Sequence, residues 1–205
     1  MSKPTLRRKR PSKRGLSETI QAVQTAHPQA HVEVWATDEH RIGLQPILRK
    51  VWALPGQRPV VPVQTRYQWR YLVGFVHPQS GRTFWQTAST VNTDAFSIEL
   101  AAFAAQAGAG PDRELILVLD RAGWHTSARL TVPAHVHLAF LPPYSPEVQP
   151  AEHLWTLSNM PLVNRHFQDL QELDDVQMLR CAALQARCDL VKARTCFHWW
   201  PLVAD

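Results

Sequence analysis

The sequence predicts an α/β fold in which a mixed central sheet is flanked by helices. Strand-like apolar segments and segments with helical spacing follow one another along the chain. Residues 115–119 are an unbroken apolar run, which is typical of a parallel strand buried on both faces. Two aromatic and β-branched segments around a turn at 78–81 predict an antiparallel hairpin, so both strand directions are expected in one sheet. The 205 residues, 45% of them hydrophobic, suit one domain with its own core.

The first elements are predicted to be a helix and a strand. Residues 16–26 carry apolar side chains at helical spacing, with Ser17 as the expected N-cap and a stop before Pro28. Residues 31–35 alternate between apolar and polar side chains, which predicts a strand that ends at about Asp38. An acidic side chain is therefore expected at the mouth of this strand.

A long loop, a hairpin and a helix follow. Residues 43–64 contain four prolines, so we expect an irregular excursion, and a loop of this length is usually functional. The hairpin strands are expected at 67–76 and 83–87. Residues 93–107 place apolar side chains on one helical face, and Gly108 closes this helix.

The second half of the chain starts with the apolar run 115–119, which we expect to be the central parallel strand. A short helix at 124–130 and another strand at 136–141 are predicted next. A helix is then expected to begin near Pro150, because proline suits the first helical position. The spacing of apolar residues over 167–191 predicts one or two further helices.

The positive charge is concentrated at the N-terminus. The formal net charge is +5, and seven of the 22 Lys and Arg residues lie in residues 1–14, which contain no acidic residue. A basic arm on a nearly neutral body suits contact with a polyanion, DNA above all. The alternative is a solvated terminus without a partner. The candidate DNA-binding residues are Lys3, Arg7, Arg8, Lys9, Arg10, Lys13 and Arg14.

Composition also bears on compartment and on zinc. No apolar run is long enough to span a bilayer and no secretory signal is recognised, so a cytoplasmic, nucleoid-associated protein is expected. The three cysteines suit a reducing compartment as free thiols. Several histidines are present, but the chain has no Cys-x-x-Cys pair or finger spacing, so no zinc site is predicted.

The tryptophans are numerous for this length, with eight in the chain. Four of them fall in segments where core packing is expected, namely Trp52, Trp69, Trp85 and Trp155. Trp199 and Trp200 are left with two possibilities, packing on the same domain or on a second protomer.

Three acids lie at the edges of predicted elements: Asp38, Asp120 and Glu152. Carboxylates that leave the same end of neighbouring strands can share a divalent cation, and a helix can add a third. Such a cluster favours Mg²⁺, because the carboxylates repel one another without a cation. Each acid taken singly could instead be a turn, cap or helix-dipole residue.

The segments around these acids resemble a known family. Residues 35–44 and 52–59, then 118–125 and 141–155, occur in the order and setting of the catalytic domain of insertion-sequence transposases of the mariner superfamily. The segment Pro-Pro-Tyr-Ser-Pro-Glu-Val-Gln-Pro-Ala-Glu within 141–155 is the most specific of them.

This resemblance implies a ribonuclease-H-like fold and a DDE triad of Asp38, Asp120 and Glu152. The triad would hold two Mg²⁺ or Mn²⁺ ions, nick DNA at the element ends and transfer the strands into target DNA. It also implies a division into a basic arm with a short helix (1–30), a DDE catalytic domain (31–175) and a C-terminal helical extension (176–205).

The family also suggests partners. Full-length relatives begin with helix-turn-helix modules that bind the terminal inverted repeats, so a separate helix-turn-helix subunit or a frameshift fusion is expected to supply them. A homodimer is a further expectation. Two alternatives stay open, namely a catalytically inactive DNA-binding remnant and a structure-selective nuclease of the same fold.

Several neighbours of the triad have expected roles. His125 would contact a ligand carboxylate or a phosphate, with packing or capping as the alternative. Glu39 is expected to be structural, as a partner of Arg41, because successive strand residues point to opposite faces. Glu147 is the reserve metal ligand. Gln149 is expected to be a poor cap for the helix that carries Glu152.

Overall fold

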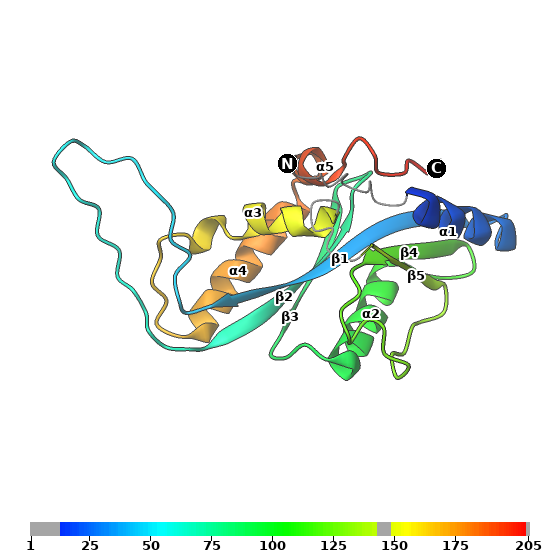
Figure 1. Ribbon diagram of the computed structural model, residues 1–205, viewed down its shortest axis with the longest axis horizontal. Helices are drawn as coiled ribbons and strands as arrows, with labels where there is room; N and C mark the ends of the chain where they lie inside the picture. Colours follow the sequence, from blue (N-terminus) through cyan, green and yellow to red (C-terminus); the bar gives the residue numbers. More distant parts are fainter. Residues whose placement is uncertain (1–12, 143–148, 204–205) are drawn as a thin grey trace, which may run out of the picture.

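A five-stranded mixed sheet organises the computed structural model, which describes residues 13–142 and 149–203 (Figure 1). The strand order is β3-β2-β1-β4-β5. Strand β1 is antiparallel to β2 and parallel to β4, and β4 is parallel to β5. This arrangement confirms the predicted mixed sheet. The run 115–119, expected to be the central strand, lies in β4 between β1 and the edge strand β5, and the middle strand is β1. The strands are β1 (His31–Gly43), β2 (Trp69–His77), β3 (Arg82–Ala88), β4 (Arg113–Leu119) and β5 (Val136–Phe140).

Strand β1 is longer than the sequence pattern predicted. It continues to Gly43 because residues 36–43 pair with residues 69–76 of β2. The expectation that this strand ends at about Asp38 was therefore wrong, and Asp38 lies within the strand. Local alternation predicts a strand but does not show how far its partner extends the pairing.

Helix α2 (Thr93–Ala107) covers one face of the sheet (Figure 1). The side chain of Asn92 caps its N-terminus by accepting a hydrogen bond from the backbone N–H of Ala95. Gly108 ends it with a left-handed φ of 74°, as predicted. Its buried Phe103 stacks on Phe75 of β2, with ring centroids 4.4 Å apart.

The remaining helices gather on the other face (Figure 1). Helix α1 begins three residues before the predicted 16–26 segment, so Ser17 lies inside the helix and does not cap it. Within the described part of the chain, no helix combines the length and apolar character of a membrane span. These helices are α1 (Lys13–Ala26), η2 (Pro150–His153), α3 (Leu154–Ser158), η3 (Met160–Leu162), α4 (Leu170–Gln185) and α5 (Cys188–Thr195).

The predicted helix at 124–130 is replaced by two turns. His125 N–H donates to the carbonyl of Ala122, and Leu130 N–H donates to the carbonyl of Ser127. Gly123 weakens helical propensity here, and the side chain of His125 is held by two carboxylates. This tertiary pairing overrides the local pattern.

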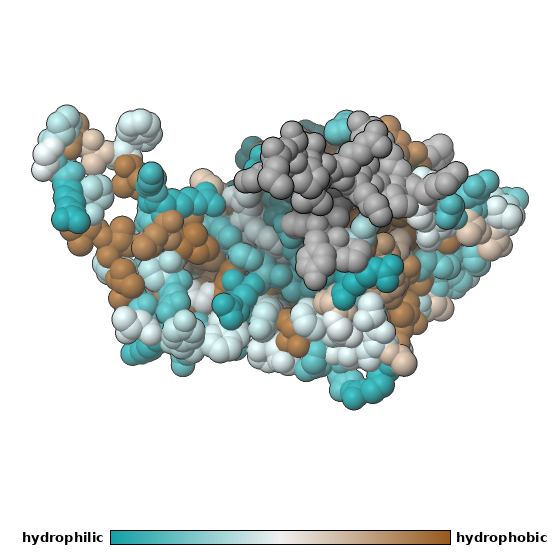
Figure 2. Space-filling view, viewed as in Figure 1, coloured by the Kyte–Doolittle hydropathy of each residue, from teal (hydrophilic) through white to brown (hydrophobic). Residues whose placement is uncertain are grey.

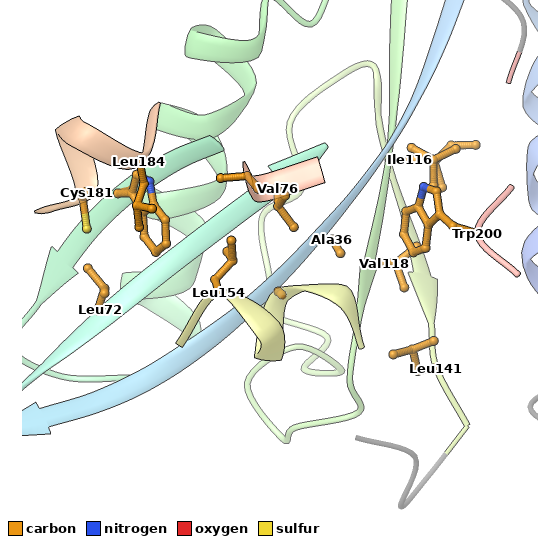
Figure 3. Close-up of a cluster of buried hydrophobic side chains, with 14 of the residues drawn as sticks. Ala36, Leu72, Val76, Ile116, Val118, Leu141, Leu154, Cys181, Leu184 and Trp200 are labelled. Atoms are coloured by element: carbon orange, nitrogen blue, oxygen red, sulfur yellow. The ribbon is translucent and has the colours of Figure 1, made fainter. Parts of the chain in front are cut away.

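The C-terminal part of the chain packs into the same core as the sheet. Helix α4 crosses residue 175, where the sequence analysis placed a division, and its Leu184 is fully buried. Trp200 is 4% exposed and lies beside Ile116 and Val118 of β4 (Figure 3). The open question about Trp200 is therefore answered in favour of packing on the same chain.

The excursion between β1 and β2 is irregular, as predicted, and extends away from the sheet (Figure 1). Hydrophobic residues lie along it and near its base (Figure 2). Trp52 is fully exposed and Trp69 is 39% exposed, so the expectation that both pack in the core was wrong. The exposed large hydrophobic residues of the excursion are Leu48, Val51, Trp52, Leu54, Val60, Val63 and Tyr67.

Candidate active site

Two of the three predicted acids lie where β4 ends beside β1. The strands pair in parallel as far as Ala36 and Val118, and Asp38 and Asp120 each follow two residues later. Because neighbouring strands are about 4.8 Å apart, the backbones of these two acids are adjacent at one edge of the parallel pair. Strand β4 has ended at Leu119 by this point, whereas β1 continues with β2 as its partner.

The third acid, Glu152, reaches this region from η2. Ala151 and Leu154, which lie on either side of Glu152 in the sequence, are fully buried in the same hydrophobic core as Ala36 of β1. Glu152 itself is exposed. Burial raises the pKa of Asp38 to about 7, and the negative charges of Glu39 and Glu152 add to this rise. The fold thus brings Glu152 close enough to Asp38 for mutual repulsion.

Trp155 holds the first acid. Its indole Nε1 donates a hydrogen bond of 2.8 Å to Oδ2 of Asp38, and this bond partly offsets the rise in the pKa of Asp38. The indole stacks on His40, with ring centroids 4.9 Å apart. On β2, the residue opposite Asp38 is Gly74, where an added Cβ would lie 3.0 Å from the Trp155 ring. A glycine at this register position therefore leaves room for the indole over the sheet.

Gln149 attaches η2 to the sheet. Its side chain makes no cap hydrogen bond, in agreement with its expected weakness as an N-cap. It is buried instead, and its Nε2 donates 2.9 Å to the carbonyl of Thr37, next to Asp38. The segment that carries Glu152 is thus tied directly to the strand that carries Asp38.

Asp120 is held by His125. Nδ1 of His125 lies 2.8 Å from Oδ1 of Asp120, which also accepts from the backbone N–H of Ala122 at 3.0 Å. Nε2 of His125 lies 2.9 Å from Oε1 of Glu39, to which the indole of Trp124 also donates at 3.3 Å. Glu39 is 7% exposed and pairs with His125, so its expected partnership with Arg41 was wrong. Arg41 instead lies over the ring of Trp69.

The imidazole between the two carboxylates is cationic at neutral pH. Burial alone would lower the pKa of His125, but hydrogen bonds to Asp120 and Glu39 and their negative charges raise it to about 9. The hydrogen bond from His125 lowers the pKa of Asp120, against an opposing contribution from burial. The side chain of Asp120 is 61% exposed, so this carboxylate is ionised and accessible.

The three acids gather at one edge without closing on a single point. Among the described residues, they do not form a group whose ligand atoms all lie within 4.8 Å of one another. Arg121, next to Asp120, is exposed and its guanidinium lies over the ring of Phe140. Glu147 lies outside the described residues, as do Lys3, Arg7, Arg8, Lys9 and Arg10, whereas Lys13 and Arg14 begin helix α1.

The donor set of this region suits a hard divalent cation. The three side chains offer only carboxylate oxygens, which Mg²⁺ and Mn²⁺ prefer. Burial raises the pKa of Asp38 most and the charges of Glu39 and Glu152 add to the rise, and a bound cation would offset this added repulsion. The residues present therefore fit such an ion.

The contact of His125 with the carboxylate of Asp120 agrees with one of the two roles predicted for it, but the other residues that hold the acids were missed. Trp155 was expected to be a core residue, and Glu39 was assigned to another partner. A signal was present for Trp155, which follows Glu152 by three residues and so lies near it on a helical segment. No local signal could link Glu39 to His125, since the two are brought together only by the fold.

Comparisons with known proteins agree with this arrangement. The profile of the DDE superfamily endonuclease family matches residues 33–174. A curated relative, the uncharacterized protein y4pE/y4sA of Sinorhizobium fredii, is 36% identical over 116 residues, which are 56% of this chain and 82% of the relative.

Solved structures of the mariner Mos1 transposase share the fold. The paired-end complex with the left transposon end has a TM-score of 0.52 at 15% identity, over 94% of this chain and 65% of that chain. The paired-end complex with Mg has a TM-score of 0.53 at 18% identity, over 94% and 64% respectively. This chain thus spans slightly less than two thirds of the length of those transposase chains.

The mixed five-stranded sheet and its likeness to the Mos1 structures show a ribonuclease-H-like fold. The chain belongs to the DDE superfamily endonucleases. Both the fold and the family confirm what the resemblance in the sequence implied.

Proposed function

We propose that this chain is the catalytic domain of a transposase, which cleaves DNA at the ends of a mobile element and transfers the strands into target DNA. Asp38, Asp120 and Glu152 would hold two Mg²⁺ or Mn²⁺ ions. The observation that carries the proposal is the position of Asp38, two residues beyond its last parallel pair with β4 and close enough to Glu152 that the charge of Glu152 adds to the rise in pKa caused mainly by burial. A divalent cation would compensate the negative charge gathered here, and the matching family has endonuclease activity.

The residues of the chain would divide the work as follows. When bound, two such ions supply an activated water and stabilise the leaving oxygen of a phosphodiester. Trp155 fixes the rotamer of Asp38 through its hydrogen bond, and His125 fixes that of Asp120. The charge of His125 also compensates one of the two carboxylates beside it. Gln149 keeps Glu152 in reach by tying its segment to β1.

DNA is the proposed substrate and partner. The solved neighbours include paired-end and strand transfer complexes of Mos1. The seven basic residues of the arm would contact phosphates without sequence preference. A separate helix-turn-helix subunit or a frameshift fusion would supply recognition of the terminal repeats. Such an enzyme would work at the nucleoid, in the cytoplasm.

We also propose a homodimer, formed through the excursion between β1 and β2. This segment exposes apolar side chains that a monomer leaves in water, with Trp52 fully exposed and Val60 86% exposed. Sedimentation of the full chain should show a dimer that Trp52→Ser weakens, whereas Trp199→Ser should leave the association unchanged. Monomeric wild-type protein over the whole concentration range would contradict this part of the proposal.

Plasmid nicking tests the proposed activity. The full chain should convert supercoiled plasmid to the nicked form with Mg²⁺ or Mn²⁺, and Asp120→Asn should abolish this. Asp94→Asn is a matched control, because Asp94 is an exposed aspartate of α2 that pairs with Arg129. Folded wild-type protein that retains DNA but does not nick it would contradict the proposal and indicate an inactive remnant. Preferential cutting of branched DNA without element ends would indicate a structure-selective nuclease.

A further inference from the structure

Three histidines surround one buried glutamate at the other end of β4. Glu114 is 0% exposed. Its Oε1 lies 3.0 Å from Nδ1 of His27 and 2.8 Å from Nδ1 of His135, and its Oε2 lies 2.8 Å from Nε2 of His137. Glu114 and Asp120 are six residues apart on and just beyond one strand, which corresponds to about 20 Å. The cluster is therefore separate from the candidate active site.

The cluster joins three elements of the fold. Glu114 directly precedes the apolar run 115–119 of β4 and lies on the face toward α1. His27 directly follows α1, and its backbone N–H still bonds to the carbonyl of Val23. His135 precedes β5 with a left-handed φ of 63°, a conformation uncommon for residues other than glycine. His137 lies within β5. The fold thus holds these side chains around Glu114 from several directions.

The geometry is close to that of a metal site. The ligand atoms of His27, Glu114 and His137 all lie within 4.8 Å of one another, and they form the one such group found among the described residues. Ligand atoms around a tetrahedral Zn²⁺ are separated by about 3.3–3.5 Å. The contacts of Glu114 with His27 and His137, 3.0 and 2.8 Å, would each need to open slightly to reach this separation, and the two histidine nitrogens are within 4.8 Å of each other. The planes of the His27 and His137 rings meet at 56°, so the rings are not stacked.

The chemical state of the groups also suits a metal. Glu114 is a carboxylate, because hydrogen bonds to His135 and His137 outweigh the effect of burial and lower its pKa. The side chains of His27 and His137 are 38% and 33% exposed, which leaves a path for an ion. His27 also lies just beyond the C-terminal end of α1, where the helix dipole favours a cation.

We propose that His27, Glu114 and His137 bind one Zn²⁺ ion, with His135 as the residue that positions the carboxylate. Two imidazole nitrogens and one carboxylate oxygen form a borderline donor set that favours Zn²⁺ or Co²⁺ over Mg²⁺. The ion would tie α1 to β4 and β5 and so fix the helix that follows the basic arm. No zinc site was predicted from the sequence, because these ligands come from separate elements and are not spaced along the chain as in a zinc finger.

A titration with Co²⁺ and Zn²⁺ in excess Mg²⁺ tests this proposal. The metal-free full chain, kept reduced, should bind one Co²⁺ with the visible absorption of a tetrahedral N/O site, and Zn²⁺ should displace it. Zn²⁺ should also raise the melting temperature. His27→Gln and His137→Gln should lose both responses, and His135→Asn should weaken binding about 10- to 100-fold.

Two controls separate this site from other binding. His166→Gln should behave as wild type, because His166 is exposed and outside the cluster. Asp120→Asn should also retain the absorption and the Zn²⁺ response, whatever happens to nicking. The proposal would be overturned by folded wild-type protein that does not bind either ion, or by equal binding in wild type and folded His27→Gln. In that case the cluster is a metal-free network of hydrogen bonds.

Discussion

At the scale of single residues, the acids of the candidate site depend on neutral and cationic donors beside them. Trp155 donates to Asp38, and His125 bridges Asp120 and Glu39. A hydrogen bond to an ionised group contributes about 1.5–3 kcal/mol. The geometry of the carboxylates is therefore set as much by these donors as by the strands.

Trp155→Phe tests the role of the indole donor. The variant keeps an aromatic ring against His40 but cannot donate to Asp38, so the pKa of Asp38 should rise further and cation binding should weaken. We expect nicking at limiting Mg²⁺ to fall about 10- to 100-fold and to recover partly at high Mg²⁺. Trp199→Phe, outside the site, is the control. Nicking equal to wild type at limiting Mg²⁺ would show that the hydrogen bond is dispensable.

The buried Glu99 of α2 predicts a pH-dependent stability. Burial, together with the negative charge of Glu39, raises the pKa of Glu99 from its ordinary 4.5 to about 7. The folded state thus binds this proton more tightly than the unfolded state, so stability is highest below 4.5 and falls as the pH rises through 7.

Glu99→Gln should remove this dependence. We compare the free energies of unfolding of Glu99→Gln and wild type by urea denaturation. The difference between them should shift in favour of the variant by roughly 1–2 kcal/mol from about pH 5 to about pH 8. Glu18→Gln, an exposed change on α1, should give no such difference. An equal effect of Glu99→Gln at both pH values would mean that Glu99 does not titrate in this range.

At the scale of elements, the packing of η2 and α3 against the sheet depends on Gly74 in β2. A methyl group at this position would press on Trp155, Leu154 and Trp85. We expect Gly74→Ala to cost about 1–3 kcal/mol of stability and to reduce nicking, because the indole is displaced from Asp38. Gly110→Ala is the control, since nothing lies within 4 Å of its added Cβ. Unchanged melting and nicking in Gly74→Ala would show that the helical layer adapts.

Local patterns predicted some elements well and others poorly. The helix at 93–107 was predicted with its closing Gly108, because its cap, apolar face and stop are all local. The end of β1 was not, because pairing with β2 extends it to Gly43. The segment 124–130 was predicted helical, but His125 is held by distant Glu39. Trp52 was expected in the core, but its side chain is fully exposed.

At the scale of the whole molecule, the candidate site region followed from the order of the motifs around the acids and from the end of the apolar run at Leu119, both of which are visible in the sequence. His125 was predicted as a contact of a ligand carboxylate, but the roles of Gln149 and Trp155 were not predicted, since these two meet β1 only after folding. The histidine cluster was missed for the same reason. Its ligands come from the end of α1, from β4 and from β5.

The two ends of β4 have different chemistry. One end presents carboxylates, for which we propose Mg²⁺ or Mn²⁺, and the other presents imidazoles around Glu114, for which we propose Zn²⁺. Hard and borderline donor sets should keep the two kinds of ion apart. Metal titrations can therefore examine the catalytic end without interference, provided that the histidine cluster is saturated with Zn²⁺ or replaced.

Binding of Mn²⁺ to the folded chain tests most directly whether Asp38, Asp120 and Glu152 form a metal site. Electron paramagnetic resonance, with Zn²⁺ present, should show saturable Mn²⁺ binding in wild type and in Asp94→Asn. The affinity should fall by more than about tenfold in Asp38→Asn, Asp120→Asn and Glu152→Gln. Equal Mn²⁺ affinity in these three folded variants and in wild type would contradict the assignment of the metal site.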